Sequence, residues 1–74
     1  MEIYKTSDIV LAATLKIKGV KLVNIEISGT KGTFVFENVD KSILMDFDLG
    51  NIKVEPVSFN NTIKQLTTSV RRLI

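Results

Sequence analysis

The chain has 74 residues, with no His, no Cys and no Trp, and with a single Tyr and a single Pro. It lacks the side chains that most often transfer protons near neutral pH, act as nucleophiles or bind transition metals. Ten Lys and Arg residues against eight Asp and Glu residues give a formal net charge of +2, which permits contact with nucleic acid without requiring it. We expect a protein that is not an enzyme and has no cofactor, metal or small-molecule substrate.

The length predicts one small globular domain over residues 1–74, with a core too small to be very stable alone. Small domains without disulfides or metals often rely on a partner subunit, so we expect a homodimer. The opening residues show no secretory signal pattern, and no apolar run is long enough to cross a bilayer. The expected location is therefore the cytoplasm, without membrane contact.

The first predicted element is a helix over residues 8–18. Thr6, Ser7 and Asp8 precede it, and such side chains cap helix N-termini, while Gly19 follows as a C-terminal stop. Apolar side chains cover most of its circumference, which is typical of a helix buried on more than one side. It is then either a central helix of the domain or a helix shared with a partner chain.

A β-hairpin follows the helix. Residues 20–27 alternate between apolar and polar side chains and are rich in β-branched residues, which predicts a strand. Residues 28–32 contain two glycines and form the predicted loop, and residues 33–37 form the returning strand. The hairpin is therefore expected to be antiparallel.

The predicted register of this hairpin places Ser28 opposite Thr33. One face of the sheet is then apolar and carries Ile25, Ile27, Phe34 and Phe36. The other face is acidic to neutral and carries Asn24, Glu26, Val35 and Glu37. This pattern is typical of a sheet that helices cover on one side.

Residues 40–49 fit two patterns. In the first, Asp40 caps a short helix that ends at Gly50 and whose inward stripe is Ile43, Leu44 and Phe47. In the second, apolar residues alternate with aspartates, as in a strand. The glycine favours the helix. Residues 52–54 then form an extended link or a third strand.

The last predicted element is a long C-terminal amphipathic helix. Pro56 suits its first turn, where the missing N–H is not needed. Its inward stripe has heptad-like spacing and consists of Phe59, Ile63, Leu66, Val70 and Leu73. The chain therefore predicts an α+β fold of a helix, an antiparallel β-hairpin, a short helix or strand and a long helix, with the helices on one face of a small sheet.

Several short motifs carry a resemblance to known proteins. Residues 4–8 read Tyr-Lys-Thr-Ser-Asp, Ala12 and Ala13 lie in the first helix, and residues 34–37 and 54–56 read Phe-Val-Phe-Glu and Val-Glu-Pro. In these motifs the chain resembles a family of short bacterial and bacteriophage-encoded proteins described as a domain of unknown function. The resemblance implies a standalone small domain of viral or mobile-element origin. It brings no established catalytic residues.

Basic residues near the C-terminus form the best functional candidate. Residues 60–74 contain no acid, and Lys64, Arg71 and Arg72 lie on one side of the predicted helix. Such a stripe can bind nucleic-acid phosphates without special geometry. The same residues could instead complement the helix dipole or pair with the acidic residues 37–55 of a second copy. Other candidates that the fold could bring alongside are Lys16, Lys18, Lys21 and, at the hairpin tip, Lys31.

Aromatic side chains have two interpretations. Tyr4 beside Lys5 could stack on a base while the lysine contacts phosphate, but packing of the ring near the helix start is favoured. Phe34 and Phe36 are of the kind that stack on bases in RNA-binding sheets, but the predicted register places them in the core.

Two further patterns are interpreted as ordinary surface features. Asp40, Asp46 and Asp48 are carboxylates of the type that binds hard cations or serves acid–base chemistry, yet a solvated surface explains them better. Residues 29–32 lack the spacing and the strand–loop–helix context of a phosphate-binding loop. No metal site and no catalytic residue is predicted.

The sequence thus favours a small accessory protein, phage-encoded and non-enzymatic, that binds nucleic acid such as single-stranded DNA through a basic helix face. The alternative is a homodimeric protein-interaction or structural module with no nucleic-acid binding. Salt-sensitive binding to oligonucleotides distinguishes the two.

Overall fold

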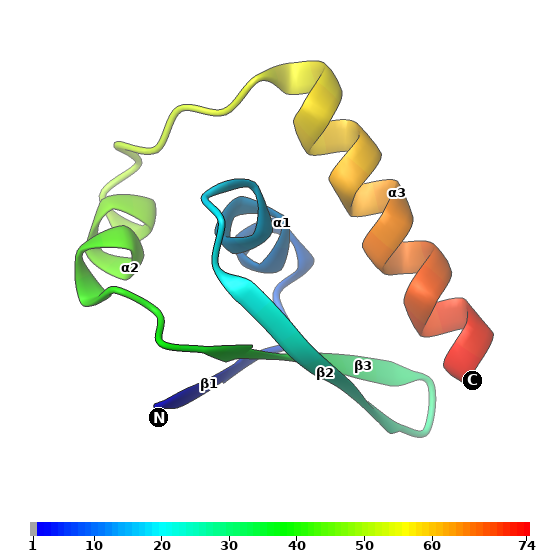
Figure 1. Cartoon of the computed structure of the whole chain (residues 1–74). Coiled ribbons are helices and arrows are strands. Elements are labelled where there is room, and N and C mark those ends of the chain that lie inside the picture. The colour runs from blue at the N-terminus through cyan, green and yellow to red at the C-terminus, as the bar shows by residue number, and fades with distance from the viewer. Residues whose placement is uncertain (1) are drawn as a thin grey trace.

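The computed structural model describes residues 2–74. Within this range the elements, in chain order, are β1 (Ile3–Thr6), α1 (Ile9–Ile17), β2 (Lys21–Ser28), β3 (Lys31–Glu37), α2 (Lys41–Asp48) and α3 (Pro56–Leu73). The strands form one antiparallel sheet in the order β1-β3-β2. The helices lie on one side of this sheet (Figure 1). The predicted α+β fold is confirmed.

Helix α1 is the central helix of the domain. The sheet lies beneath it, α2 and α3 flank it, and the link over residues 49–55 passes on its side away from the sheet (Figure 1). Every residue from Leu11 to Leu15 is buried. The buried hydroxyl of Thr14 donates a hydrogen bond to the carbonyl oxygen of Val10 at 2.9 Å. The central-helix interpretation is supported, although Val10 on the same helix is 44% exposed.

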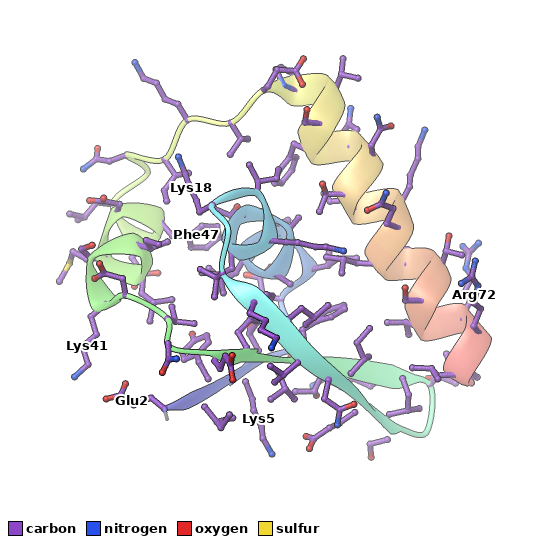
Figure 2. All side chains as sticks on the ribbon, viewed as in Figure 1. Glu2, Lys5, Lys18, Lys41, Phe47 and Arg72 are labelled. Atoms are coloured by element: carbon purple, nitrogen blue, oxygen red, sulfur yellow. The ribbon has the colours of Figure 1, made fainter. Side chains whose placement is uncertain are left out.

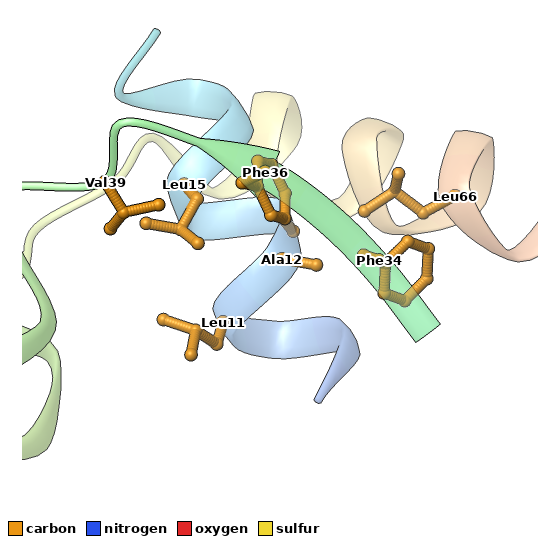
Figure 3. Close-up of a cluster of buried hydrophobic side chains, with 8 residues drawn as sticks. Leu11, Ala12, Leu15, Phe34, Phe36, Val39 and Leu66 are labelled. Atoms are coloured by element: carbon orange, nitrogen blue, oxygen red, sulfur yellow. The ribbon is translucent and has the colours of Figure 1, made fainter. Parts of the chain in front are cut away.

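The core lies where β3, α1 and α3 meet (Figure 3). Phe34 is 2% exposed and Phe36 is fully buried, and both project from β3 into the core (Figure 3). Burial of such a side chain stabilises the fold by about 1.5–3 kcal/mol. The core interpretation of both phenylalanines is confirmed, so neither ring is free to stack on a base. The buried cluster consists of Leu11, Ala12, Ala13, Leu15, Phe34, Phe36, Val39 and Leu66.

Strand β1 is an element that the sequence pattern does not predict. It pairs with β3, with Tyr4 opposite Phe36 and Lys5 opposite Val35. Tyr4 therefore packs against the core from within the sheet, which supports its structural interpretation. The third strand of the sheet is β1, and the alternative that residues 52–54 form it is wrong, because they belong to an irregular link.

The β2–β3 hairpin differs from the prediction in its register. Ser28 pairs with Lys31 across a turn at Gly29 and Thr30, whereas the prediction pairs Ser28 with Thr33. Gly29 has a φ of 64°, a conformation that tight hairpin turns require at a central position. Because side chains alternate with a period of two, a shift of two residues leaves each one on its predicted face.

A β-bulge interrupts β2 between Leu22 and Asn24. Residues three apart lie on opposite faces of a regular strand, but here Leu22 and Ile25 both pack against the core. The extra residue, Val23, restores Leu22 to the apolar face. The bulge therefore brings one more apolar side chain under the helices.

Helices α2 and α3 both begin at an acidic cap. Oδ1 of Asp40 accepts a hydrogen bond from the backbone N–H of Ser42 at 2.9 Å, and the Glu55 carboxylate accepts one from Ser58. The predicted helix over residues 40–49 is confirmed, and Phe47 points from α2 toward α1 (Figure 2). The predicted inward stripe packs against the core, and all three of its residues take part, namely Ile43, Leu44 and Phe47.

The inward stripe of α3 ends one turn earlier than predicted. Phe59, Ile63, Leu66 and Val70 pack on the core, but Leu73 is 55% exposed, because α3 there reaches the hairpin turn at the end of the sheet (Figure 1). A Cβ at Gly32 would lie only 2.7 Å from Cγ2 of Val70. The glycine therefore lets α3 lie directly against β3.

Candidate functional site

A ridge of polar and basic side chains follows the exposed side of α3. Lys64, Thr68 and Arg72 recur every four residues, so they lie above one another on the helix surface. At a rise of 1.5 Å per residue the ridge spans about 12 Å. Gln65 and Ser69 lie beside it, at the same four-residue interval.

Lys16 of α1 completes a basic hollow with this ridge. The basic hollow lies between α1 and α3, has a volume of about 410 Å³ and is lined by Lys16, Lys64, Gln65, Thr68, Ser69 and Arg72. No carboxylate lines it. None of its cations forms an ion pair with a carboxylate within residues 2–74. The hollow is thus a concave, positively charged surface with neutral hydrogen-bond donors between its charges.

Arg71 belongs to a different hollow from Arg72. With Lys31 of the hairpin tip it lines an amphipathic hollow of about 360 Å³, whose apolar side chains are Ile9, Phe34, Val70 and Ile74. Figure 2 shows Arg72 on the outer surface of α3, near the C-terminal end. The predicted single stripe of Lys64, Arg71 and Arg72 is therefore divided between two surfaces.

Lys18 and Lys21 line neither hollow. Nζ of Lys18 lies 3.5 Å from the carbonyl oxygen of Lys53, beside the link that leads to α3 (Figure 2). Nζ of Lys21 lies 3.8 Å from Oε1 of Glu37 in the sheet. The structure thus places Lys16, Lys64 and Arg72 around the basic hollow. Lys31 and Arg71 line the amphipathic hollow, and Lys18 and Lys21 lie outside both.

Sequence reasoning selects the charged residues and Thr68 but misses Gln65 and Ser69. Gln65 and Ser69 carry no charge, yet they line the basic hollow between Lys64 and Arg72. Their four-residue spacing, parallel to that of the basic ridge, is the signal that could have identified them.

The sheet face without helices is a poor surface for phosphate. It carries Glu26 and Glu37, as predicted, and Lys5 points away from the helices toward this side (Figure 2). Nζ of Lys5 lies 3.2 Å from Oε2 of Glu26, which neutralises both charges. Val35 lies on this face at only 5% exposure. The long side chains of neighbouring strands cover such a position with their apolar stems.

Acidic residues do not gather into a site. Asp40 caps α2, and Asp46 and Asp48 are exposed on the same helix. Across residues 2–74, no group of three or more carboxylates is placed to hold a metal ion. In the same part of the chain, no helix combines the length and apolar character needed to cross a membrane.

Comparison with known families places the chain in one of them. Residues 1–71 match the family described as Domain of unknown function (DUF5659). The chain belongs to this family. It matches no curated protein and no solved structure. The resemblance to a domain of unknown function is confirmed, and what the hollows of this DUF5659 domain bind must be inferred from their own chemistry.

Proposed function

We propose that this DUF5659 domain is a non-enzymatic nucleic-acid-binding protein whose basic hollow contacts backbone phosphates. The observation that carries the proposal is the convergence of Lys16, Lys64 and Arg72 on one hollow without a carboxylate. Cations gathered on a concave surface raise the local potential and attract a polyanion. The neutral donors Gln65 and Thr68 suit phosphate oxygens, which accept many contacts of this kind, whereas the Ser69 hydroxyl already donates to the carbonyl oxygen of Gln65 at 3.0 Å.

The lining of the basic hollow favours backbone contact over base recognition. No aromatic side chain lines it, so it offers no platform on which an unpaired base could stack. A duplex carries one charge per ~1.7 Å of its axis, so a ridge of about 12 Å faces several phosphates. The proposed binding is therefore independent of base sequence.

The role of an accessory protein encoded by a phage and acting in the cytoplasm belongs to the same proposal. It rests on the resemblance of residues 4–8, 34–37 and 54–56 to short bacterial and bacteriophage proteins, and on the small size of the domain. Proteins that bind nucleic acid without sequence preference depend on charge, and Lys16, Lys64 and Arg72 of this chain line one hollow beside α3.

Fluorescence anisotropy of labelled single- and double-stranded oligonucleotides tests the proposal. The informative variant is Lys64→Glu/Arg72→Glu, and its matched control is Lys41→Glu/Lys53→Glu, with both lysines exposed and outside either hollow. Each double variant lowers the formal net charge by four, from +2 to −2. We expect the first variant to lose binding at low salt and the control to keep most of it.

Two results contradict the proposal. Absence of binding by the unmodified protein at low salt removes nucleic acid as a partner. Equal loss in both variants, with the helical circular dichroism of each unchanged, shows that net charge rather than the basic hollow is responsible.

A second candidate, the homodimeric interaction module, is favoured by apolar side chains on α2. Met45 and Leu49 are 59% and 64% exposed and lie one turn apart. These two side chains are more exposed than Val10 of α1, which is 44% exposed, so a dimer would use this outer surface of α2. Sedimentation equilibrium at high micromolar concentration tests it: a dimer that Met45→Asp/Leu49→Asp converts to a monomer supports the module, and a monomeric unmodified protein contradicts it.

A further inference from the structure

The amphipathic hollow lies at the C-terminal end of α3 and differs in chemistry from the basic hollow. Its floor is apolar and comes from three elements, with Ile9 from α1, Phe34 from β3 and Val70 from α3. Its charges are Lys31, from the hairpin tip, and Arg71, from the last turn of α3. The basic hollow has no comparable apolar floor. The two surfaces should therefore select different ligands.

The fold creates this hollow where α3 passes the end of the sheet. Contact between Gly32 and Val70 holds the helix against β3. One turn later Leu73 is already exposed, so the helix no longer closes against the hairpin. Ile74 lines the opening that remains. Ile9 and Val70 are partly buried and Phe34 is 2% exposed, so the floor is the partly covered edge of the core.

No acidic side chain lines the amphipathic hollow beside its two cations. Its lining contains no Asp or Glu, and neither Lys31 nor Arg71 forms an ion pair with a carboxylate in the described part of the chain. Asp8, next to the lining in sequence, accepts hydrogen bonds from the backbone N–H groups of Val10 and Leu11 at 2.9 and 3.3 Å. Its charge is therefore directed to the first turn of α1.

We propose that the amphipathic hollow binds a small amphipathic anion, an aliphatic chain that ends in a carboxylate. The chain lies on Ile9 and Val70 at the edge of the core, and the carboxylate accepts charge-assisted hydrogen bonds from Lys31 and Arg71. A volume of about 360 Å³ falls within the range of small-ligand sites, which extends over about 300–1,000 Å³. This activity is separate from nucleic-acid binding and does not depend on it.

Titration of the labelled protein with sodium decanoate, followed by backbone amide NMR shifts, tests the proposal. Two further ligands separate the contributions, because acetate carries the charge without the chain and decyltrimethylammonium carries the chain with the opposite charge. We expect saturable shifts with decanoate alone, at residues 30–34 and 67–74. Absence of saturable shifts with decanoate, or equal binding of the cationic amphiphile, overturns the proposal.

Paired variants separate this site from the basic hollow. Lys31→Gln/Arg71→Gln and Lys64→Gln/Arg72→Gln remove the same number of charges from exposed positions on the two hollows. We expect the first pair to weaken decanoate binding at least about tenfold, as loss of charge-assisted hydrogen bonds does, and the second pair to leave it unchanged. Equal weakening by both pairs, or by neither, overturns the assignment. Oligonucleotide titrations of the same variants report on the basic hollow independently.

Discussion

Arg71 and Arg72 are neighbours in the sequence, yet they line different hollows. One residue corresponds to a rotation of about 100° around an α-helix, so consecutive side chains leave α3 in different directions. Arg72 continues the ridge that begins at Lys64, whereas Arg71 turns toward the hairpin tip and Lys31. The placement of the two arginines on different hollows therefore follows from helix geometry.

Single substitutions should reveal this difference. We expect Arg72→Gln to weaken oligonucleotide binding by about two- to fivefold, the effect of one exposed charge contact, and Arg71→Gln to leave it nearly unchanged. Anisotropy titrations at low salt measure both. If Arg71→Gln weakens binding as much as Arg72→Gln, the division of the two arginines between hollows has no functional meaning.

Gly32 has a role in packing that can be measured. An alanine at this position would place Cβ 2.7 Å from Cγ2 of Val70, so Gly32→Ala should destabilise the fold by about 1–3 kcal/mol. In a Val70→Ala background the clash is absent, and Gly32→Ala should be neutral or stabilising, since glycine weakens strands. Urea unfolding of the four proteins gives the coupling energy. Additive effects would show that the contact is unimportant.

The sequence marks Gly32 as special without indicating why. As one of two glycines near the predicted loop, it is interpreted as part of the turn, but Gly29 makes the turn and Gly32 lies within β3. The requirement at Gly32 comes from Val70, which is 38 residues away in the chain. No local pattern contains that information.

The helices of this domain could be predicted because their signals are local. Caps such as Asp8 and Asp40, stops such as Gly19, and the apolar stripe of α3 all lie within or beside the element that they define. The sheet was harder to predict, because the pairing of its strands depends on residues that are distant in the sequence. Strand β1 has only four residues and pairs with a strand some 30 residues later, and its side chains fit a helix lead-in equally well.

The acidic caps make α2 and α3 sensitive to low pH. Donation from the backbone N–H of Ser42 lowers the pKa of Asp40 below its ordinary value of 3.8, and donation from Ser58 lowers the pKa of Glu55 below 4.5. A lowered pKa in the folded state adds stability that is complete above the unfolded value and lost as the pH falls through the folded value. The free energy of unfolding should therefore decrease below a pH of about 4.5.

Urea unfolding across this pH range checks the role of the caps. The variant Asp40→Asn/Glu55→Gln should lose less stability than the unmodified protein as the pH falls, because neither substituted side chain titrates. Parallel pH profiles for the two proteins would show that these carboxyls do not contribute to acid sensitivity.

On the scale of the whole molecule, the domain is a flat disk whose charged residues are unevenly distributed. The principal extents are 33 × 31 × 18 Å, and α1 occupies the centre of the ring formed by the sheet, α2, the link and α3 (Figure 1). The neutralised sheet face and the acidic α2 lie apart from the basic hollow. In the proposed function, a polyanion approaches the domain along α3.

The sequence identified the charged residues of the candidate site but not their grouping. Lys16 lies 48 residues before Lys64, and only the packing of α1 against α3 places both beside one hollow. The same packing leaves Lys18 and Lys21 outside it, although they are close to Lys16 in the chain. Composition predicts the amount of charge, and tertiary structure decides where it is concentrated.

The salt dependence of single-stranded DNA binding tests the central claim most directly. Three phosphate contacts, from Lys16, Lys64 and Arg72, predict a slope of log Kobs against log salt of about −2, since each contact on a single strand contributes about −0.7. The slope should approach zero in the folded variant Lys16→Gln/Lys64→Gln/Arg72→Gln. A slope of about −2 that persists in this variant, or no binding at the lowest salt, would contradict the account.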